Sequence, residues 1–206
     1  MELFFFTTIY LSYFFLFVAM ICGIVKFKKL RDTEKWYTYY LIYTFLIEGA
    51  VTVSVDFLHA TATDHIYPFY IGGVFFILTF LYLKKLNFQK IWLYLMPVLG
   101  LVYLVAQLFL NDLNHDYVKV ISNIIIFGFA GLALLQEIRK TESDNRFLLA
   151  DAFIFLYYAV SAFIFILHNK LGNMLISHAY LVWGINNILT CVLYSSFIYT
   201  FLRLKK

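Results

Sequence analysis

The sequence has few charged residues and few cysteines. Only 14% of its 206 residues are charged, against about a quarter in soluble globular domains, while 63% are apolar. This balance excludes a water-soluble domain, and the high apolar content also excludes intrinsic disorder. The two cysteines exclude a small scaffold held together by disulfides. The chain is therefore expected to be an integral membrane protein.

The sequence also lacks the motifs of common catalytic and cofactor sites. It contains no GxGxxG or GxxxxGK[ST] phosphate-binding loop, and no CxxC or HExxH metal motif. The last apolar segment, 178–202, has no lysine near its centre that could form a Schiff base, which excludes a retinal protein. We expect no bound cofactor, so any activity must reside within the apolar bundle or at its rims.

The apolar residues fall into seven continuous segments, each about as long as an α-helix that crosses a bilayer. They do not show the alternation that is typical of transmembrane β-strands. The predicted spans are 3–25, 36–58, 67–83, 91–110, 118–138, 147–167 and 178–202. The prediction is an all-α integral membrane bundle of seven transmembrane helices, forming a single domain over residues 1–206.

Basic residues gather in alternate gaps of this pattern. The segments that hold 14 of the 16 lysines and arginines are 26–35, 84–90, 139–146 and 203–206. The other two, Lys119 and Lys170, are assigned to the opposite gaps. The positive-inside rule then predicts an N-terminus outside and a C-terminus in the cytoplasm. Basic loops that face anionic lipid account for the net charge of +4, so we expect no nucleic-acid partner.

Span two carries polar residues where a bilayer makes them costly. With about 100° between successive residues, Thr52, Asp56 and His59 all lie within about 80° of Glu48. They form one stripe from the middle of the membrane to its outer rim. Glu48 has two interpretations: a protonated acid bonded to Asn186 between helices, or a group that binds protons or a ligand. Asp56 and His59 are interpreted as a pair of side chains at the outer rim of the membrane, where both face water.

Other spans place polar groups at a similar depth. The further residues predicted for the cavity are Gln107, Asn123, His178, Asn186 and Asn187. Together with the stripe on span two, they predict an outward-facing polar cavity lined by spans two, four, five and seven. Asp151 lies near the cytoplasmic end of span six, where we expect it to snorkel or to pair with Arg146 or Lys140.

Two segments partly resemble a family of metal enzymes. Span two ends SVDFLHATATD and span seven begins HAYLVW. The alkaline ceramidase and progestin-receptor-like superfamily of seven-helix hydrolases has S-x-x-x-H on span two and H-x-x-x-H on span seven. His59 and His178 would be the metal ligands, but the spacing from Ser54 to His59 is one residue too long and Val182 stands where the second histidine belongs. We therefore predict no metal site.

A wider resemblance covers most of the chain. The stretch LIEGAVTVSVDFLHATATDHIYPFYIGGVFFILTFLYLKKL and the ending HAYLVWGINNILTCVLYSSFIYTFL resemble an uncharacterised seven-helix family common in Bacteroidetes. Its features are an I-x-P-x-Y segment at 66–70 and a W-x-x-N-N segment at 183–187. The resemblance implies that the protein lies in a bacterial inner membrane.

These observations lead to one leading hypothesis and two alternatives. The leading hypothesis is a module in the lipid bilayer that binds or senses a small molecule or lipid and signals to a separate cytoplasmic partner through its basic loops. The first alternative is an intramembrane lipid hydrolase of the ceramidase kind. The second is a small carrier or proton-coupled transporter, whose activity would depend on Glu48.

Overall fold

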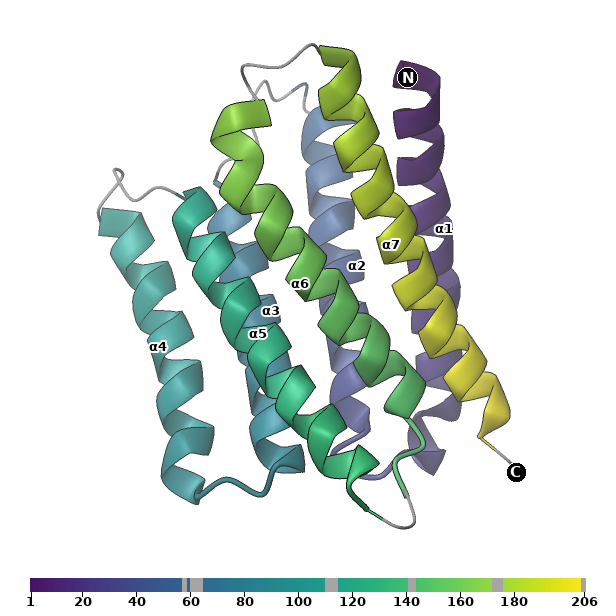
Figure 1. Cartoon of the computed structure of the whole chain (residues 1–206), viewed down its shortest axis with the longest axis vertical. Coiled ribbons are helices and arrows are strands. Elements are labelled where there is room, and N and C mark those ends of the chain that lie inside the picture. The colour runs from purple at the N-terminus through teal and green to yellow at the C-terminus, as the bar shows by residue number, and fades with distance from the viewer. Residues whose placement is uncertain (57–58, 60–64, 110–114, 141–143, 172–175, 205–206) are drawn as a thin grey trace.

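The computed structural model of the chain is a bundle of helices (Figure 1). It describes residues 1–206 except 57–58, 60–64, 110–114, 141–143, 172–175 and 205–206. Its elements are α1 (Glu2–Lys26), the short 3-10 helix η1 (Phe27–Lys29), α2 (Lys35–Asp56), α3 (Tyr67–Lys85), α4 (Lys90–Phe109), α5 (His115–Ile138), α6 (Leu148–Leu171) and α7 (Ile176–Arg203). The described residues include no strand, and the all-α prediction is confirmed.

Six of the helices are long and apolar enough to cross a membrane. These are α1, α2, α3, α5, α6 and α7. In α4, the apolar stretch found among the described residues is Lys90–Tyr103, which is shorter than the other six. The structure thus supports a helical protein that passes a membrane several times, while a seventh crossing by α4 stays a prediction.

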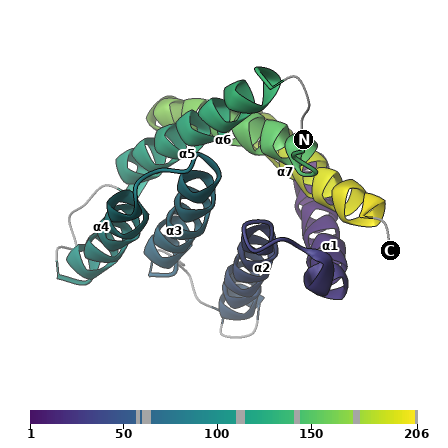
Figure 2. The same cartoon turned by 90° about the horizontal axis from the view of Figure 1, so that it is seen from below.

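The six long helices form a ring, which we call the six-helix ring. Helix α1 packs on α2 and α7, α3 packs on α2 and α5, and α6 packs on α5 and α7 (Figure 2). Helix α4 packs against α3 at the edge of the bundle. The two chain termini lie at opposite ends of the bundle, here called the N-terminal end and the C-terminal end (Figure 1). The link from α1 to α2, which contains Lys28 and Lys29, and the link from α3 to α4, which Lys84, Lys85 and Lys90 flank, lie at the C-terminal end.

Stacked aromatic side chains fill the six-helix ring near its C-terminal end. Tyr37 of α2 stacks on Phe147, with the ring centroids 4.5 Å apart. Phe147 meets Phe201 of α7 edge to face, and Phe197 contacts both Tyr37 and Phe201. All four side chains are buried. Because large aromatic rings pack closely here, this layer closes the bundle on the C-terminal side of the cavities described below.

The outside of the bundle is rich in exposed apolar side chains. On α1 these include Tyr10, Phe14 and Val25, and on α4 they include Tyr94 and Val102. Soluble monomers rarely expose apolar side chains over so much of their surface. The distribution is that of a bundle whose outer face contacts lipid.

Helix α3 is continuous although its sequence contains Pro68 and a glycine pair. Pro68 lies in the first turn, where the missing N–H removes no helical hydrogen bond. Gly73 faces α2, and a Cβ atom added to it would lie 2.1 Å from the ring of Tyr43. The hydroxyl of Tyr43 donates a hydrogen bond to the carbonyl oxygen of Phe69 at 2.6 Å. The glycine thus allows α2 and α3 to approach each other closely.

Candidate functional site

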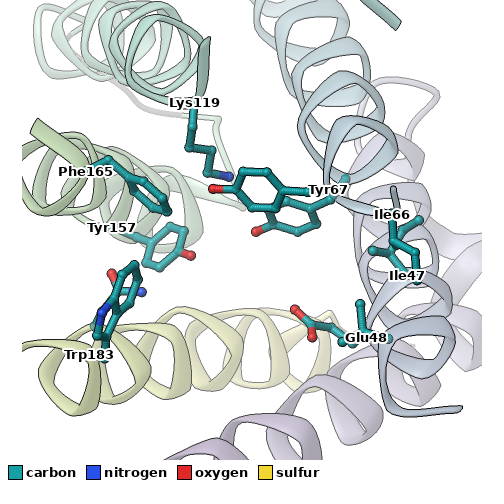
Figure 3. Close-up of a pocket in the computed structure, with 11 residues that line it drawn as sticks. Ile47, Glu48, Ile66, Tyr67, Lys119, Tyr157, Phe165 and Trp183 are labelled. Atoms are coloured by element: carbon teal, nitrogen blue, oxygen red, sulfur yellow. The ribbon is translucent and has the colours of Figure 1, made fainter. Parts of the chain in front are cut away.

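Two neighbouring cavities lie within the six-helix ring. The first, named the Lys119 cavity, has a volume of about 270 Å³ and begins beside Ile66 and Tyr67, at the start of α3 (Figure 3). The second, named the Tyr13 cavity, has a volume of about 350 Å³ and reaches Leu16 of α1 and Tyr194 of α7. The residues that line both are Glu48, Tyr70, Tyr157, Trp183 and Asn186. Because they share these walls, the two cavities are adjacent, and together they form the candidate site.

The lining differs from the one that the sequence predicted. Spans two, four, five and seven were expected to supply it, whereas α1, α3 and α6 also contribute. No described residue of α4 lines either cavity, because α4 packs outside the six-helix ring on α3. The described residues of α4 thus do not contribute to these two cavities, and a contribution of span four to an outward cavity stays a prediction.

Glu48 is the acidic residue of the site. It lies in α2, is half-buried, and lines both cavities. Its carboxyl group interacts with the hydroxyl of Tyr13 on α1. The hydrogen bond from Glu48 to Asn186 that the sequence suggested is not among the bonds found between described residues. Glu48 thus faces open space as well as one tyrosine, and this leaves its carboxyl oxygens available to a ligand.

Lys119 is the basic residue of the site, and the sequence had placed it in a gap between spans. The structure instead places it inside α5, with only 3% of the residue exposed. Its ammonium nitrogen lies 4.1 Å from the centroid of the Tyr70 ring, a cation–π contact between α5 and α3. Lys119 and Glu48 act on each other electrostatically across the cavity. Among the ion pairs of the described residues, none joins these two charges directly.

Asn186 of α7 supplies an acceptor without a partner. The residue is 8% exposed and lines both cavities. Its side-chain oxygen Oδ1 is buried and accepts no hydrogen bond from any described residue. A buried amide oxygen without a partner is unfavourable by about 1–3 kcal/mol. The Oδ1 of Asn123 is also buried without a partner, so Asn186 differs by belonging to a residue in the wall of both cavities.

Three further predicted residues make contacts between or within helices. Asn187 donates from Nδ2 to the hydroxyl of Thr8 at 3.3 Å and lines the Tyr13 cavity. Thr52 donates its hydroxyl hydrogen to the backbone oxygen of Glu48, one turn away, at 2.9 Å. Asn123 is fully buried, donates from Nδ2 to Ser161 at 3.0 Å, and is not among the residues that line the two cavities. Asn123 therefore joins α5 to α6.

The remaining predicted residues lie toward the N-terminal end. His59 and His178 are exposed, and neither lines the two cavities. The described part of the chain contains no group of three His, Cys, Asp or Glu side chains close enough to hold a metal ion. Asp56 and Gln107 belong to α2 and α4, but their side chains lie outside what the structure describes.

Sequence reasoning missed the basic and aromatic half of the site. Lys119 was assigned to a gap between spans, although the predicted span 118–138 already included it. Tyr70, Tyr157 and Trp183 lie in spans where many aromatic residues face lipid, so composition alone does not distinguish them. A lysine one turn inside an apolar helix is the signal that could have identified the site, because such a charge must find a polar environment.

A second polar cluster lies at the C-terminal end, around Asp151 of α6. Asp151 was expected to snorkel or to pair with Arg146 or Lys140, but it is fully buried and forms an ion pair with Lys85 of α3. The hydroxyl of Tyr82 donates to it at 3.1 Å, and Tyr37 also donates to it. The expected pairing was wrong because α3 and α2 approach α6 here and bring a lysine and two tyrosines to the carboxylate.

The two basic residues expected near Asp151 pair with other carboxylates. Arg146 forms an ion pair with Glu34, which ties the start of α6 to the link between α1 and α2. Lys140 pairs with Glu137, three residues before it, at 2.8 Å. A third cavity, of about 280 Å³, opens among these charged side chains at the C-terminal end.

An exposed ion pair joins the link between α1 and α2 to the link between α5 and α6. Arg31 donates from both terminal nitrogens to Asp144, at 2.7 and 3.0 Å. The guanidinium group lowers the pKa of the Asp144 carboxyl below its ordinary value, chiefly through this hydrogen bonding. Since both side chains are largely exposed, the pair contributes little stability and is screened by salt.

The geometry of the site is thus a pair of neighbouring cavities with an acid at one wall, a buried lysine at another and aromatic rings between them. Chemically, such an arrangement can hold a polar molecule by complementary charge and hydrogen bonds, with the rings excluding water. Comparison of the chain with protein-family models, with curated proteins and with solved structures finds no match to any of them.

Proposed function

We propose that the protein is a membrane-embedded binding module that takes up a small polar molecule in the cavities between Glu48 and Lys119. The N-terminal end would face outward, and all seven helices would cross a bacterial inner membrane. Binding of the molecule would be signalled to a separate partner protein in the cytoplasm. The basic segments at the C-terminal end would form the surface that this partner contacts. These assignments rest on the charge pattern of the sequence and on the site described above.

One observation carries the proposal: two residues of opposite charge, Glu48 and Lys119, line the Lys119 cavity together with Asn186. Charged groups within a bundle are costly unless they pair or face a polar cavity. Here Glu48 and Lys119 form no direct ion pair among the described residues, although both reach the Lys119 cavity. A ligand would complete the missing interactions, which explains why the fold keeps these residues apart.

Signal transfer has a structural basis in shared helices. Helix α2 carries Glu48 in the cavities and Tyr37 in the Asp151 cluster, and α6 carries Tyr157 in the cavities and Asp151 itself. A ligand that changes the tilt of α2 against α6 would act on a polar cluster that joins the same two helices. Because the cluster is held by hydrogen bonds of defined geometry, small movements there would alter the charged surface beside it.

A carrier is the second candidate, favoured by the cavity at the C-terminal end. Cavities at both ends, separated by the stacked aromatic layer of Tyr37, Phe147, Phe197 and Phe201, are the arrangement that alternating access requires. A carrier would move its substrate into sealed liposomes, and this uptake would depend on Glu48. A binding module would bind without transport.

Accessibility of the site to water tests the proposed function. Asn186→Cys is placed in a protein whose own thiols are removed by Cys22→Ala and Cys191→Ala. A thiol reagent that cannot cross membranes is added to intact cells. We expect it to label the cysteine at position 186, because this residue lines both cavities.

The matched control is Leu46→Cys in the same background. Leu46 lies on α2 close to Glu48 in sequence, but 62% of it is exposed on the apolar outer surface. A thiol surrounded by lipid ionises poorly and reacts slowly, so this variant should stay unlabelled. Labelling at position 186 no faster than at position 46 would contradict an open polar cavity. Labelling at 186 only in inverted vesicles would show that the cavity opens to the cytoplasm.

A further inference from the structure

Charge is divided unevenly between the two cavities, and this division points to the class of ligand. Lys119 lines only the first cavity, where Glu48 also lies. The described lining of the Tyr13 cavity includes Glu48 but no lysine or arginine. The site therefore has a negative end, which extends toward α1 and α7, and a positive end at α5 beside the start of α3.

The negative end is a set of hydrogen-bond acceptors. Glu48 and Asn186 line the same space, and the buried Oδ1 of Asn186 has no hydrogen-bond partner among the described residues. A primary ammonium group has three N–H donors and no acceptor, which suits a wall that holds a carboxylate and an amide. The rings of Tyr157 and Trp183 line the same part of the site, and aromatic faces attract cations.

The positive end of the site is Lys119, which makes a cation–π contact with an aromatic ring. The ammonium group of Lys119 lies over Tyr70, and the structure gives it no carboxylate partner within the described residues. A buried ammonium is strongly stabilised by a carboxylate that accepts its hydrogen bonds. The Lys119 cavity, shown in Figure 3, brings this group and Tyr67 to the same open space.

We propose that the ligand is a small amino-carboxylate zwitterion, with its ammonium group at Glu48 and Asn186 and its carboxylate at Lys119. The inference rests on the proposed binding function and names the class of molecule for that same site. A ligand with only one charge would leave either Glu48 or Lys119 without a partner of opposite charge. A zwitterion gives each of the two residues a partner of opposite charge. The occupied site is then electrically neutral, which is favourable in a medium of low dielectric constant.

The experiment uses the full-length protein in lipid nanodiscs and measures binding by calorimetry. The probes are ω-amino acids from glycine to 6-aminohexanoate, leucine as a branched α-amino acid, and matched singly charged compounds, butylamine and butyrate. We expect at least one amino acid to bind at least about tenfold more tightly than both butylamine and butyrate. The chain length that binds best would measure the separation of the two charged groups.

Two variants assign the two ends. Lys119→Met should remove the advantage of the amino acid over the amine, since the carboxylate loses its partner. Glu48→Gln should remove the advantage over the free acid. Trimethylglycine should bind more weakly than the primary ammonium compounds, because it has no N–H to donate to Asn186. Asn123→Ala changes a residue that lines neither cavity, so it is the control and should leave all affinities unchanged.

Three outcomes would overturn the inference. The first is that none of the amino acids binds, and the second is that butylamine or butyrate binds the wild-type protein as tightly as the best of them. The third is amino-acid binding that is unchanged in both Lys119→Met and Glu48→Gln, with each variant folded as judged by its unfolding temperature. In each case the labelling of Asn186→Cys would still decide independently whether the cavity is an open polar site.

Discussion

Lys119 and Tyr70 lie in contact inside the six-helix ring, with the lysine ammonium nitrogen 4.1 Å from the centroid of the tyrosine ring. The contact joins α5 to α3 at the cavity wall. It partly compensates the buried charge by a cation–π interaction, which is stronger where water is excluded. The lysine thereby keeps a charged group directed at the cavity without a carboxylate beside it.

The ion pair at the other end should be essential for stability. Asp151→Ala leaves Lys85 in a largely buried position without its partner, so we expect the free energy of unfolding to fall by about 3–5 kcal/mol. Adding Lys85→Met should recover a large part of this loss, because the isolated charge is then removed as well. Reversible unfolding in detergent micelles measures both variants. If the double variant instead loses the sum of the free energies lost by the two single variants, the two residues do not depend on each other.

The close approach of α2 and α3 depends on a glycine. Gly73→Ala places a Cβ atom 2.1 Å from the ring of Tyr43, and overpacking of this kind costs about 1–3 kcal/mol. Gly128→Ala in α5 is the matched control, because a Cβ there meets nothing within 4 Å and alanine favours the helix. Thermal unfolding should show a lowered midpoint for the first variant only. Combining Gly73→Ala with Tyr43→Ala should relieve the clash, and failure to do so would contradict the packing described.

The exposed pair between Arg31 and Asp144 predicts a small dependence of stability on pH. Because Arg31 lowers the pKa of Asp144 in the folded state, the stabilisation is complete above about pH 4, the ordinary range of an unfolded aspartate, and is lost as the pH falls through the lowered pKa. Asp144→Asn should therefore lower the unfolding temperature slightly at pH 6. The difference should vanish at about pH 2, and also at about 1 M salt, where exposed charges are screened. A difference that persists under both conditions would assign another role to Asp144.

Much of the fold follows from the sequence. Long apolar segments predict helices of the length needed to cross a bilayer, and the helices observed begin and end close to the predicted spans. The alternation of basic segments predicts that the two termini lie at opposite ends, as Figure 1 shows. What the pattern does not contain is the order of helices around the ring. The peripheral place of α4 follows from packing between helices and not from hydropathy.

The site was predictable only on its acidic side. Glu48 and Asn186 stand out because they are polar residues in the middle of apolar spans, and both line the cavities. Lys119 lies close enough to the end of its helix to be assigned to a loop, and only the packing of α5 against α3 directs it inward. The same limit explains Asp151, whose partner Lys85 is 66 residues away in the sequence.

We propose that Glu48 and Lys119 direct opposite charges into one cavity. A cysteine at Val51, which lines the Lys119 cavity, reports this field when the rates of labelling by an anionic and a cationic methanethiosulfonate are compared. In the background without Cys22 and Cys191, we predict that Lys119→Met lowers the ratio of anionic to cationic rates and that Glu48→Gln raises it, each severalfold. Asn123→Ala should leave the ratio unchanged. A ratio that is the same in the parent protein, Lys119→Met and Glu48→Gln would contradict the account.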